Sequence, residues 1–259
     1  SKETKIISNK NKNKNKKIKI AFLSSDLKKH SVSFFLKDLF FKIDKKIVEI
    51  IALSNLDKNK EDSTSEAMKN SINQWHVISD KSDIEVINLV KSLDVDILID
   101  LNGLFEGNRV HVMKNRCAPI QICWLGYNNS TGLKNMDYLI ADHNLIKKNE
   151  ESLYSEKILY LPKIWNTYSR PAELPPINYP TKKDSLLFSY GSFNNFKKIS
   201  EDTIEVWSKI IKNSNSQIYL KNPQENVSLD LKENIIKKFT DRGVQKNKII
   251  FLETEKNTY

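Results

Sequence analysis

The sequence predicts an α/β protein made of two Rossmann-like domains, the second of them incomplete. Short apolar runs alternate along the chain with segments of helical periodicity. The runs are apolar almost throughout, as in parallel strands that are covered on both faces. A stretch with four prolines, within residues 171–183, interrupts the alternation and is typical of a linker between domains. A length of 259 residues allows one or two such domains.

The first domain is predicted over residues 17–170. Two of its segments carry apolar side chains at helical spacing, residues 36–43 and 86–93, and the second follows a capping box from Ser82 to Glu85. Strands and helices that alternate in this way predict a doubly wound parallel sheet. Its expected strands are KIKIAFLSS, IVEIIALS, QWHVIS, VDILIDLNG, PIQICWLG, DYLIAD and KILYLP.

The second domain is predicted over residues 184–259. Its expected elements are a strand at LLFSY, a helix ending at Asn213, a strand at QIYLK, a helix over residues 231–240 and a strand at KIIFLE. Three parallel strands leave an open edge, so we expect this domain to be cut off. The missing initiator methionine leads to the same expectation for the start of the chain. Residues 1–16 are basic and of low complexity, which predicts a disordered linker.

The composition argues against several classes of function. The formal net charge is +10, but only four of the 42 basic residues are arginine, the residue that nucleic-acid readers favour, so no nucleic-acid partner is expected. No apolar run is long enough to span a membrane, and no secretory signal is present. Cys117 and Cys123 lie too far apart along one predicted strand for a disulfide, which indicates a reducing cytoplasm. No histidines or cysteines have the spacing of metal ligands.

Glycines mark the places where chemistry is expected. The chain has only six, and Gly243 follows a helical pattern as a predicted C-terminal cap. The other five stand at strand-to-loop junctions, where the backbone takes positive φ or a ligand approaches the main chain: Gly103, Gly107, Gly126, Gly132 and Gly191.

The segment after LLFSY joins a tight turn, two lysines and the start of a helix. Ser200 is the predicted N-cap, with Glu201 and Asp202 in the first turn. Lys198 therefore stands beside the free amides of a helix N-terminus, an arrangement that binds phosphate. Most lysines in so lysine-rich a chain are simply solvated, and that alternative stays open.

Five segments occur in the order found in family 41 glycosyltransferases: SSDLKKHS, DLNGLFEGNR, CAPIQICWLGYNNSTGLKNMDYLIAD, YSEKILYLP and GSFNNFKKIS. Over residues 17–252 the chain resembles this family, which includes O-linked N-acetylglucosamine transferase. The resemblance implies a GT-B fold that holds a nucleotide sugar between two Rossmann-like domains. It implies inverting, metal-independent transfer of N-acetylglucosamine from UDP-GlcNAc to a Ser or Thr hydroxyl of a protein or peptide acceptor. It also implies a catalytic region truncated at both ends, without the family's tetratricopeptide array.

The resemblance assigns roles to single residues. Lys198 matches the lysine that contacts the diphosphate, and Asn195 matches an amide near the nucleotide. Gly126 and Tyr127 fall in the WLGY stretch that lines the sugar pocket, and Arg109 matches an arginine of the cleft.

Asp26 and His30 match catalytic candidates at the mouth of the first domain, where they would assist the acceptor hydroxyl. From the residues alone a structural role is favoured. Asp26 would cap the helix that follows the first strand, and His30 would be a polar residue at its entrance. Whether the histidine is a base or a positioning group stays open.

Two departures from the family pattern keep other functions open. Leu104 stands where relatives carry His or Tyr, and Asn128 replaces the proline after WLGY, which allows a catalytically weak peptide-binding protein. Asn129 in YNNSTG resembles SPINDLY-like relatives and favours O-fucosyl transfer from GDP-fucose as a second enzyme function. Because the family's C-terminal phosphate loop is missing, we expect the chain by itself to bind nucleotide sugar weakly and to show no transfer.

Overall fold

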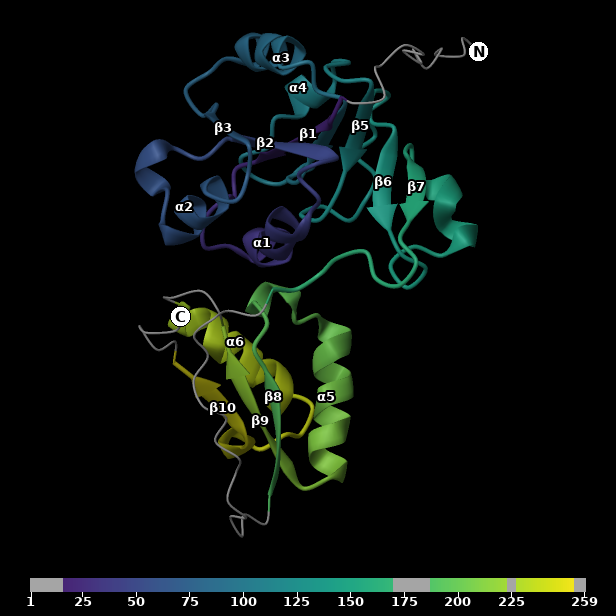
Figure 1. The fold of residues 1–259 in the computed structure, drawn as a ribbon. Helices are drawn as coiled ribbons and strands as arrows, with labels where there is room; N and C mark the ends of the chain where they lie inside the picture. Colours follow the sequence, from purple (N-terminus) through teal and green to yellow (C-terminus); the bar gives the residue numbers. More distant parts are fainter. Residues whose placement is uncertain (1–15, 170–186, 223–226, 254–259) are drawn as a thin grey trace. The chain divides into compact units, whose positions relative to one another are not determined.

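The computed structural model describes residues 16–169, 187–222 and 227–253, and the chain divides after Ala172 into two compact units (Figure 1). The linkers predicted at residues 1–16 and 171–183 lie outside the described residues, apart from Lys16. Each unit contains its own parallel sheet.

The first unit is built on a seven-stranded parallel sheet in the order β3-β2-β1-β4-β5-β6-β7. From β1, the chain adds strands first on one side and then, from β4 onward, on the other, which confirms the doubly wound topology. The strands are β1 (Ile18–Ser24), β2 (Val48–Ser54), β3 (Gln74–Val77), β4 (Ile97–Asp100), β5 (Ile120–Cys123), β6 (Tyr138–Ala141) and β7 (Lys157–Tyr160).

Helices cover both faces of this sheet (Figure 1). Because successive side chains of a strand point to opposite faces, Phe22 packs with α1 and α2 while Leu23 packs with α3 and α4. The predicted capping box is confirmed: Ser82 Oγ accepts from the amide of Glu85, whose carboxylate accepts from the amide of Ser82. The helices are α1 (Ser31–Lys42), α2 (Ser63–Lys69), α3 (Asp83–Ser92) and α4 (Val110–Met113), with 3-10 turns η1 (Lys58–Lys60) and η2 (Lys148–Leu153).

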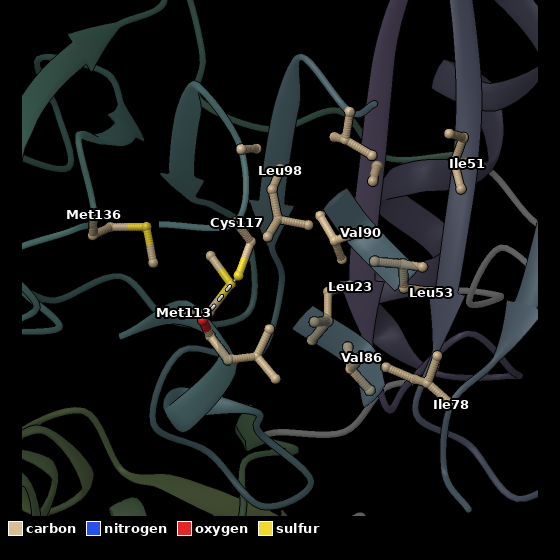
Figure 2. Close-up of a cluster of buried hydrophobic side chains, with 14 of the residues drawn as sticks. Leu23, Ile51, Leu53, Ile78, Val86, Val90, Leu98, Met113, Cys117 and Met136 are labelled. Atoms are coloured by element: carbon tan, nitrogen blue, oxygen red, sulfur yellow. Dashed lines mark hydrogen bonds between the residues drawn. The ribbon is translucent and has the colours of Figure 1, made fainter. Parts of the chain in front are cut away.

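Figure 2 shows the core on the α3 and α4 face. Leu23 and Leu53 of the central strands meet Val86 of α3. Cys117 belongs to the same cluster, and its Sγ donates to the carbonyl oxygen of Val112 at 3.3 Å. Both cysteines are buried and free, as predicted, and burial raises the pKa of the Cys117 thiol to about 11.

The last described residues of the first unit lie along α1. The amide of Ser169 donates to the carbonyl oxygen of Phe34 (2.7 Å), and its Oγ accepts from the amide of Asp38 (3.0 Å). Thr167 Oγ1 donates to the carbonyl oxygen of Phe35 (3.2 Å). The segment is thus attached to α1 by hydrogen bonds to its main chain, and the ring of Tyr168 also packs against the rings of Phe34 and Phe35.

The second unit contains three parallel strands in the order β10-β9-β8. Ile204 of α5 and Ile235 of α6 share one cluster with Ile218 of β9, so both helices cover the same face. This follows from strands that succeed one another in one direction through right-handed crossovers, and the described part of this unit is wound one way only. Its elements are β8 (Phe188–Ser192), η3 (Phe196–Lys198), α5 (Glu201–Asn213), β9 (Ser216–Lys221), α6 (Leu229–Thr240), η4 (Lys246–Lys248) and β10 (Ile249–Leu252).

Candidate functional site

A pocket of about 460 Å³ opens at the carboxyl ends of β1, β4 and β5 in the first unit. The chain leaves β1 toward one side of the sheet and β4 toward the other, so this is the switch point at which open α/β sheets bind ligands. The polar lining comes from Asp26, His30, Asn102 and Glu106, and the apolar walls from Val32, Phe35, Leu101, Phe105 and Leu125.

His30 is the N-cap of α1. Its backbone is extended, and its Nδ1 accepts a hydrogen bond from the amide of Val32 at 3.3 Å. The expectation that Asp26 caps this helix is therefore wrong, because the helix begins at Ser31 and the cap is the residue directly before it. Since Nδ1 is the acceptor, the neutral ring carries its proton on Nε2 and offers a hydrogen-bond donor.

Asp26 is fixed in the pocket wall by contacts from two sides. Its Oδ2 accepts from Asn102 Nδ2 at 3.1 Å and lies 4.0 Å from Nδ1 of His30. Its amide donates to Ser24 Oγ (3.0 Å), and its carbonyl oxygen accepts from Ser33 Oγ (2.9 Å). The two residues predicted at the mouth of the first domain are thus brought together.

The loop after β4 supplies residues that the sequence reasoning missed. Asn102 is 1 % exposed, and its side chain bonds both Ser25 and Asp26. The buried carboxylate of Asp100 accepts from the amides of Asn102 (3.0 Å) and Gly103 (3.1 Å). Burial raises the pKa of Asp100 to about 6, although these two hydrogen bonds act in the opposite direction. The available signal was the run DLNG directly after an apolar strand, where polar side chains reach the carboxyl edge of a sheet.

Gly126 lines the pocket, and its lack of a side chain is required by packing. A Cβ there would overlap the carbonyl oxygen of Leu101. Tyr127 contacts the lining indirectly, because its ring meets Phe105 edge-on with centroids 5.4 Å apart. The WLGY stretch therefore reaches the pocket through its glycine.

Positive φ is confirmed at three of the five glycine junctions, and Gly126 is constrained by neighbouring backbone instead. The three glycines with positive φ are Gly103, Gly107 and Gly132. Gly191 is the exception: it lies inside β8 without positive φ, and the nearest atom to an added Cβ is 3.7 Å away. The expectation of positive φ is wrong there because β8 continues through Gly191 to Ser192, so the glycine has an extended backbone.

Arg109 lies outside the pocket lining, in a network of its own. Its guanidinium donates to Asn55 Oδ1 (2.9 Å), Asp83 Oδ1 (2.9 Å) and the carbonyl oxygen of Ile78 (2.7 Å), and its side chain is 14 % exposed. These contacts join the loop after β4 to the ends of β2 and β3. A role for Arg109 in substrate binding stays a prediction.

The other two predicted site residues lie in the second unit. Asn195 caps η3 through Oδ1, which accepts from the amide of Lys197 at 3.0 Å. Ser200 caps α5 by accepting from the amide of Thr203 at 3.2 Å, which confirms the predicted N-cap. Lys198 precedes this cap and is exposed, and among the described residues its ammonium has no ion-pair partner. Whether it contacts a diphosphate stays a prediction.

Three histidines outside the pocket lie where the sequence places them: His76 on β3, His111 on α4 and His143 after β6. In the described ranges, no three or more histidine, cysteine, aspartate or glutamate side chains are grouped so as to bind a metal ion. Over the same ranges, no helix has the length and apolar character needed to cross a membrane.

The two α/β units, the first with a doubly wound sheet, have the GT-B fold. The chain is similar to the O-GlcNAc transferase of Thermobaculum terrenum, solved as a lysine-to-methionine variant, with a TM-score of 0.85 and 24% identity over 93% of this chain and 45% of that one. It is also similar to the lipopolysaccharide outer core galactosyltransferase WaaB, with a TM-score of 0.51 and 15% identity over 92% of this chain and 69% of that one.

The family can be stated more closely. The profile of glycosyl transferase family 41 matches residues 1–169, and the chain belongs to this family. A similar relative is the probable UDP-N-acetylglucosamine–peptide N-acetylglucosaminyltransferase SPINDLY of Oryza sativa subsp. japonica, 31% identical over 196 residues. That match covers 74% of this chain and 21% of the relative, so the chain spans about a fifth of the length of the curated relatives it matches.

Proposed function

We propose that this protein transfers N-acetylglucosamine from UDP-GlcNAc to serine or threonine hydroxyls of cytoplasmic proteins, with inversion and without a metal. The observation that carries the proposal is the pocket at the switch point, where the Asp26 carboxylate and the His30 ring lie together in a family 41 chain. The printed name of the rice relative, which gives UDP-N-acetylglucosamine and peptide as substrates, supports this donor and this kind of acceptor.

In this transfer the acceptor oxygen bonds to the anomeric carbon while the bond from that carbon to the diphosphate oxygen breaks. The acceptor loses a proton, and the nucleoside diphosphate leaves with one more negative charge. We assign the proton to Asp26, since an ionised carboxylate only accepts hydrogen bonds and this one lines the pocket. His30 would orient the acceptor by donation from Nε2, because its Nδ1 is engaged by Val32.

Lys198 would stabilise the departing diphosphate. It is exposed and lies just before the N-terminus of α5, where free amides and the helix dipole favour an anion. A cation and a helix N-terminus together supply the charge stabilisation that a metal provides in other enzymes. Asn195 uses its Oδ1 for the turn, which leaves Nδ2 for the nucleotide. Gly126 and Tyr127 keep their proposed places on the sugar side, with the stronger support for Gly126, which lines the pocket, and Arg109 keeps its proposed place as an arginine of the cleft.

The proposal is tested with the complete gene product, labelled UDP-GlcNAc and a library of Ser- and Thr-containing peptides. We expect hydroxyl-linked N-acetylglucosamine by mass spectrometry, undiminished by EDTA, and loss of transfer in Asp26→Asn. Transfer from GDP-fucose alone would establish the O-fucosyl function instead. Peptide binding without transfer from either donor would establish a peptide-binding protein and overturn the proposal.

A further inference from the structure

Asn102 has a place in the pocket that the roles proposed above leave unused. We infer that it is a positioning residue that acts through Asp26, by holding one carboxylate oxygen so that the other is left for the acceptor. This inference rests on the proposed function of Asp26.

The orientation of the Asn102 amide is determined by its neighbours. Oδ1 accepts from the amide of Ser25 at 2.9 Å, while Nδ2 donates to Ser25 Oγ at 2.8 Å and to Asp26 Oδ2 at 3.1 Å. The reverse orientation would set a nitrogen donor against the Ser25 amide and an oxygen against the carboxylate, so only one assignment fits. Nearly complete burial keeps water from competing for these contacts.

The support beneath Asn102 is rigid. The carboxylate of Asp100 accepts from the amides of Asn102 and Gly103, and this fixes the turn at the end of β4. The side chain of Asn102 then joins the loop after β4 to the loop after β1, which are neighbouring strands. Among the described residues, Oδ1 of Asp26 has no hydrogen-bond partner, whereas Oδ2 is held by Asn102. One carboxylate oxygen is therefore available to a ligand.

A purely structural link between two loops would use the same contacts, so the test must separate stability from turnover. Asn102→Asp keeps the acceptor for the Ser25 amide and replaces the donor to Asp26 by an oxygen. Asp26→Asn combined with Asn102→Asp exchanges donor and acceptor. The hydrogen bond between positions 26 and 102 is restored, but the carboxylate now lies at position 102 instead of position 26. Asn108→Asp is the matched control, because Asn108 lies on the same loop and bonds Phe105 and Val110 instead.

The experiment measures the unfolding temperature and the steady-state kinetics of these variants with the complete gene product. We expect Asn102→Asp to lower the unfolding temperature by several degrees and kcat by roughly ten- to a hundredfold, with the KM for UDP-GlcNAc little changed. The exchanged double variant should regain the unfolding temperature but not kcat. The control loses its own donor to the carbonyl oxygen of Phe105, so its unfolding temperature should also fall, but its kcat should match the wild type.

Three results would overturn the inference: wild-type kcat in Asn102→Asp, wild-type kcat in the exchanged variant, or no recovery of the unfolding temperature on exchange. The first two would leave Asn102 a structural residue, and the third would show that the contact with Asp26 does not form in solution. If the wild type itself transfers no sugar, the proposed function fails and the positioning role fails with it. The unfolding temperatures still report on the contact in that case.

Discussion

The carboxyl edges of the two sheets hold their polar residues in opposite ways. At the edge of the seven-stranded sheet, Asp100 and Asn102 are buried and fully engaged, and they fix Asp26 in the pocket wall. At the edge of the three-stranded sheet, Lys198 is exposed. The side chain of Asn195 stabilises the turn there through one hydrogen bond, which its Oδ1 accepts from the amide of Lys197. The first edge is organised before any ligand arrives, whereas the second leaves its cation free to be ordered by one.

This difference corresponds to the chemistry proposed for each edge. A proton acceptor must be aligned to within a hydrogen bond of one hydroxyl, so a buried network serves it. A diphosphate is a large anion that a flexible ammonium can follow, and a lysine acts on it as a point charge. Substitutions at the first edge should therefore alter folding and turnover together, and those at the second should alter turnover alone.

The largest effect is expected at the second edge. Lys198→Ala should lower kcat by roughly a hundred- to a thousandfold, because the charge that develops on the diphosphate loses its cation. The unfolding temperature should stay unchanged, since the side chain is exposed. Steady-state kinetics and thermal unfolding check this, with the neighbouring exposed Lys197→Ala as control. Near-normal turnover would remove Lys198 from the mechanism.

The next effect is a difference between the two edges in how the free energy of unfolding depends on pH. Asp100 has its ordinary pKa near 3.8 when unfolded and about 6 when folded, so between these values the folded protein keeps a proton that the unfolded chain has lost. The free energy of unfolding therefore falls as pH rises through this window and stays lower above it. Relative to Asp100→Asn, which cannot titrate, the wild type should lose about 3 kcal/mol between pH 3 and pH 7. Urea unfolding measures this, and an equal change in the free energy of unfolding with pH in the wild type and in Asp100→Asn would contradict the prediction.

Glu201, in the first turn of α5, should respond in the opposite direction. Its hydrogen bond with Lys238, and then the neighbouring Arg242, lower its pKa. Its contribution is therefore present above the ordinary pKa of a glutamate and is lost as pH falls through the folded value. Comparison of Glu201→Gln with the wild type over the same pH range supplies the contrast, and a loss on raising the pH would show the sign to be wrong.

Two glycines sharpen the comparison through packing alone. Gly126→Ala should destabilise the protein by roughly 2 to 3 kcal/mol, because the added methyl meets the backbone of Leu101. At Gly191 the added methyl would make only an ordinary van der Waals contact with the Phe193 ring at 3.7 Å, so Gly191→Ala should change stability by less than about 0.5 kcal/mol. Urea unfolding measures both, and equal losses would mean that the tight packing around Gly126 is relieved at no cost.

The smallest effect concerns the cap of α5. Ser200→Ala removes the acceptor for the Thr203 amide and should cost about 1 kcal/mol. The backbone amides at the start of α5, which are proposed to face the diphosphate, remain present in this variant. The KM for UDP-GlcNAc should therefore rise only slightly. Ser200→Asp should retain stability, as aspartate is an equally good cap. A large rise in KM for both variants would point to direct contact of the Ser200 hydroxyl with the donor.

The features that the sequence predicted well are those that local periodicity determines. The strands, the end of α5 at Asn213 and the Ser200 cap depend on neighbours within a few residues, and the sequence shows those directly. Lys198 and Asn195 could be selected as candidates from the sequence because their motif is continuous, and their roles stay predictions.

The network behind Asp26 depends on residues far apart in the chain. The Asn102 amide bonds Ser25 across a separation of 77 residues, and Arg109 bonds Asn55 across 54. The periodicity of a sequence does not show which loops contact each other. These contacts depend on the order of the strands in the sheet, which is a property of the tertiary structure. The N-cap of α1 was expected at Asp26 but is His30, because a helix can begin one turn later than its first candidate cap.

The attachment of residues 167–169 to α1 has a consequence for how this protein can change over evolutionary time. Ser169 and Thr167 bind the main chain of α1 at positions 34, 35 and 38, and every residue type except proline offers the same carbonyl and amide groups there. A point substitution in α1 therefore leaves these main-chain hydrogen bonds in place, although a change at Phe34 or Phe35 loses a ring contact with Tyr168. An insertion or deletion within the helix is different, because it would rotate those groups away by about 100° per residue. Lineages should accordingly preserve the length of α1.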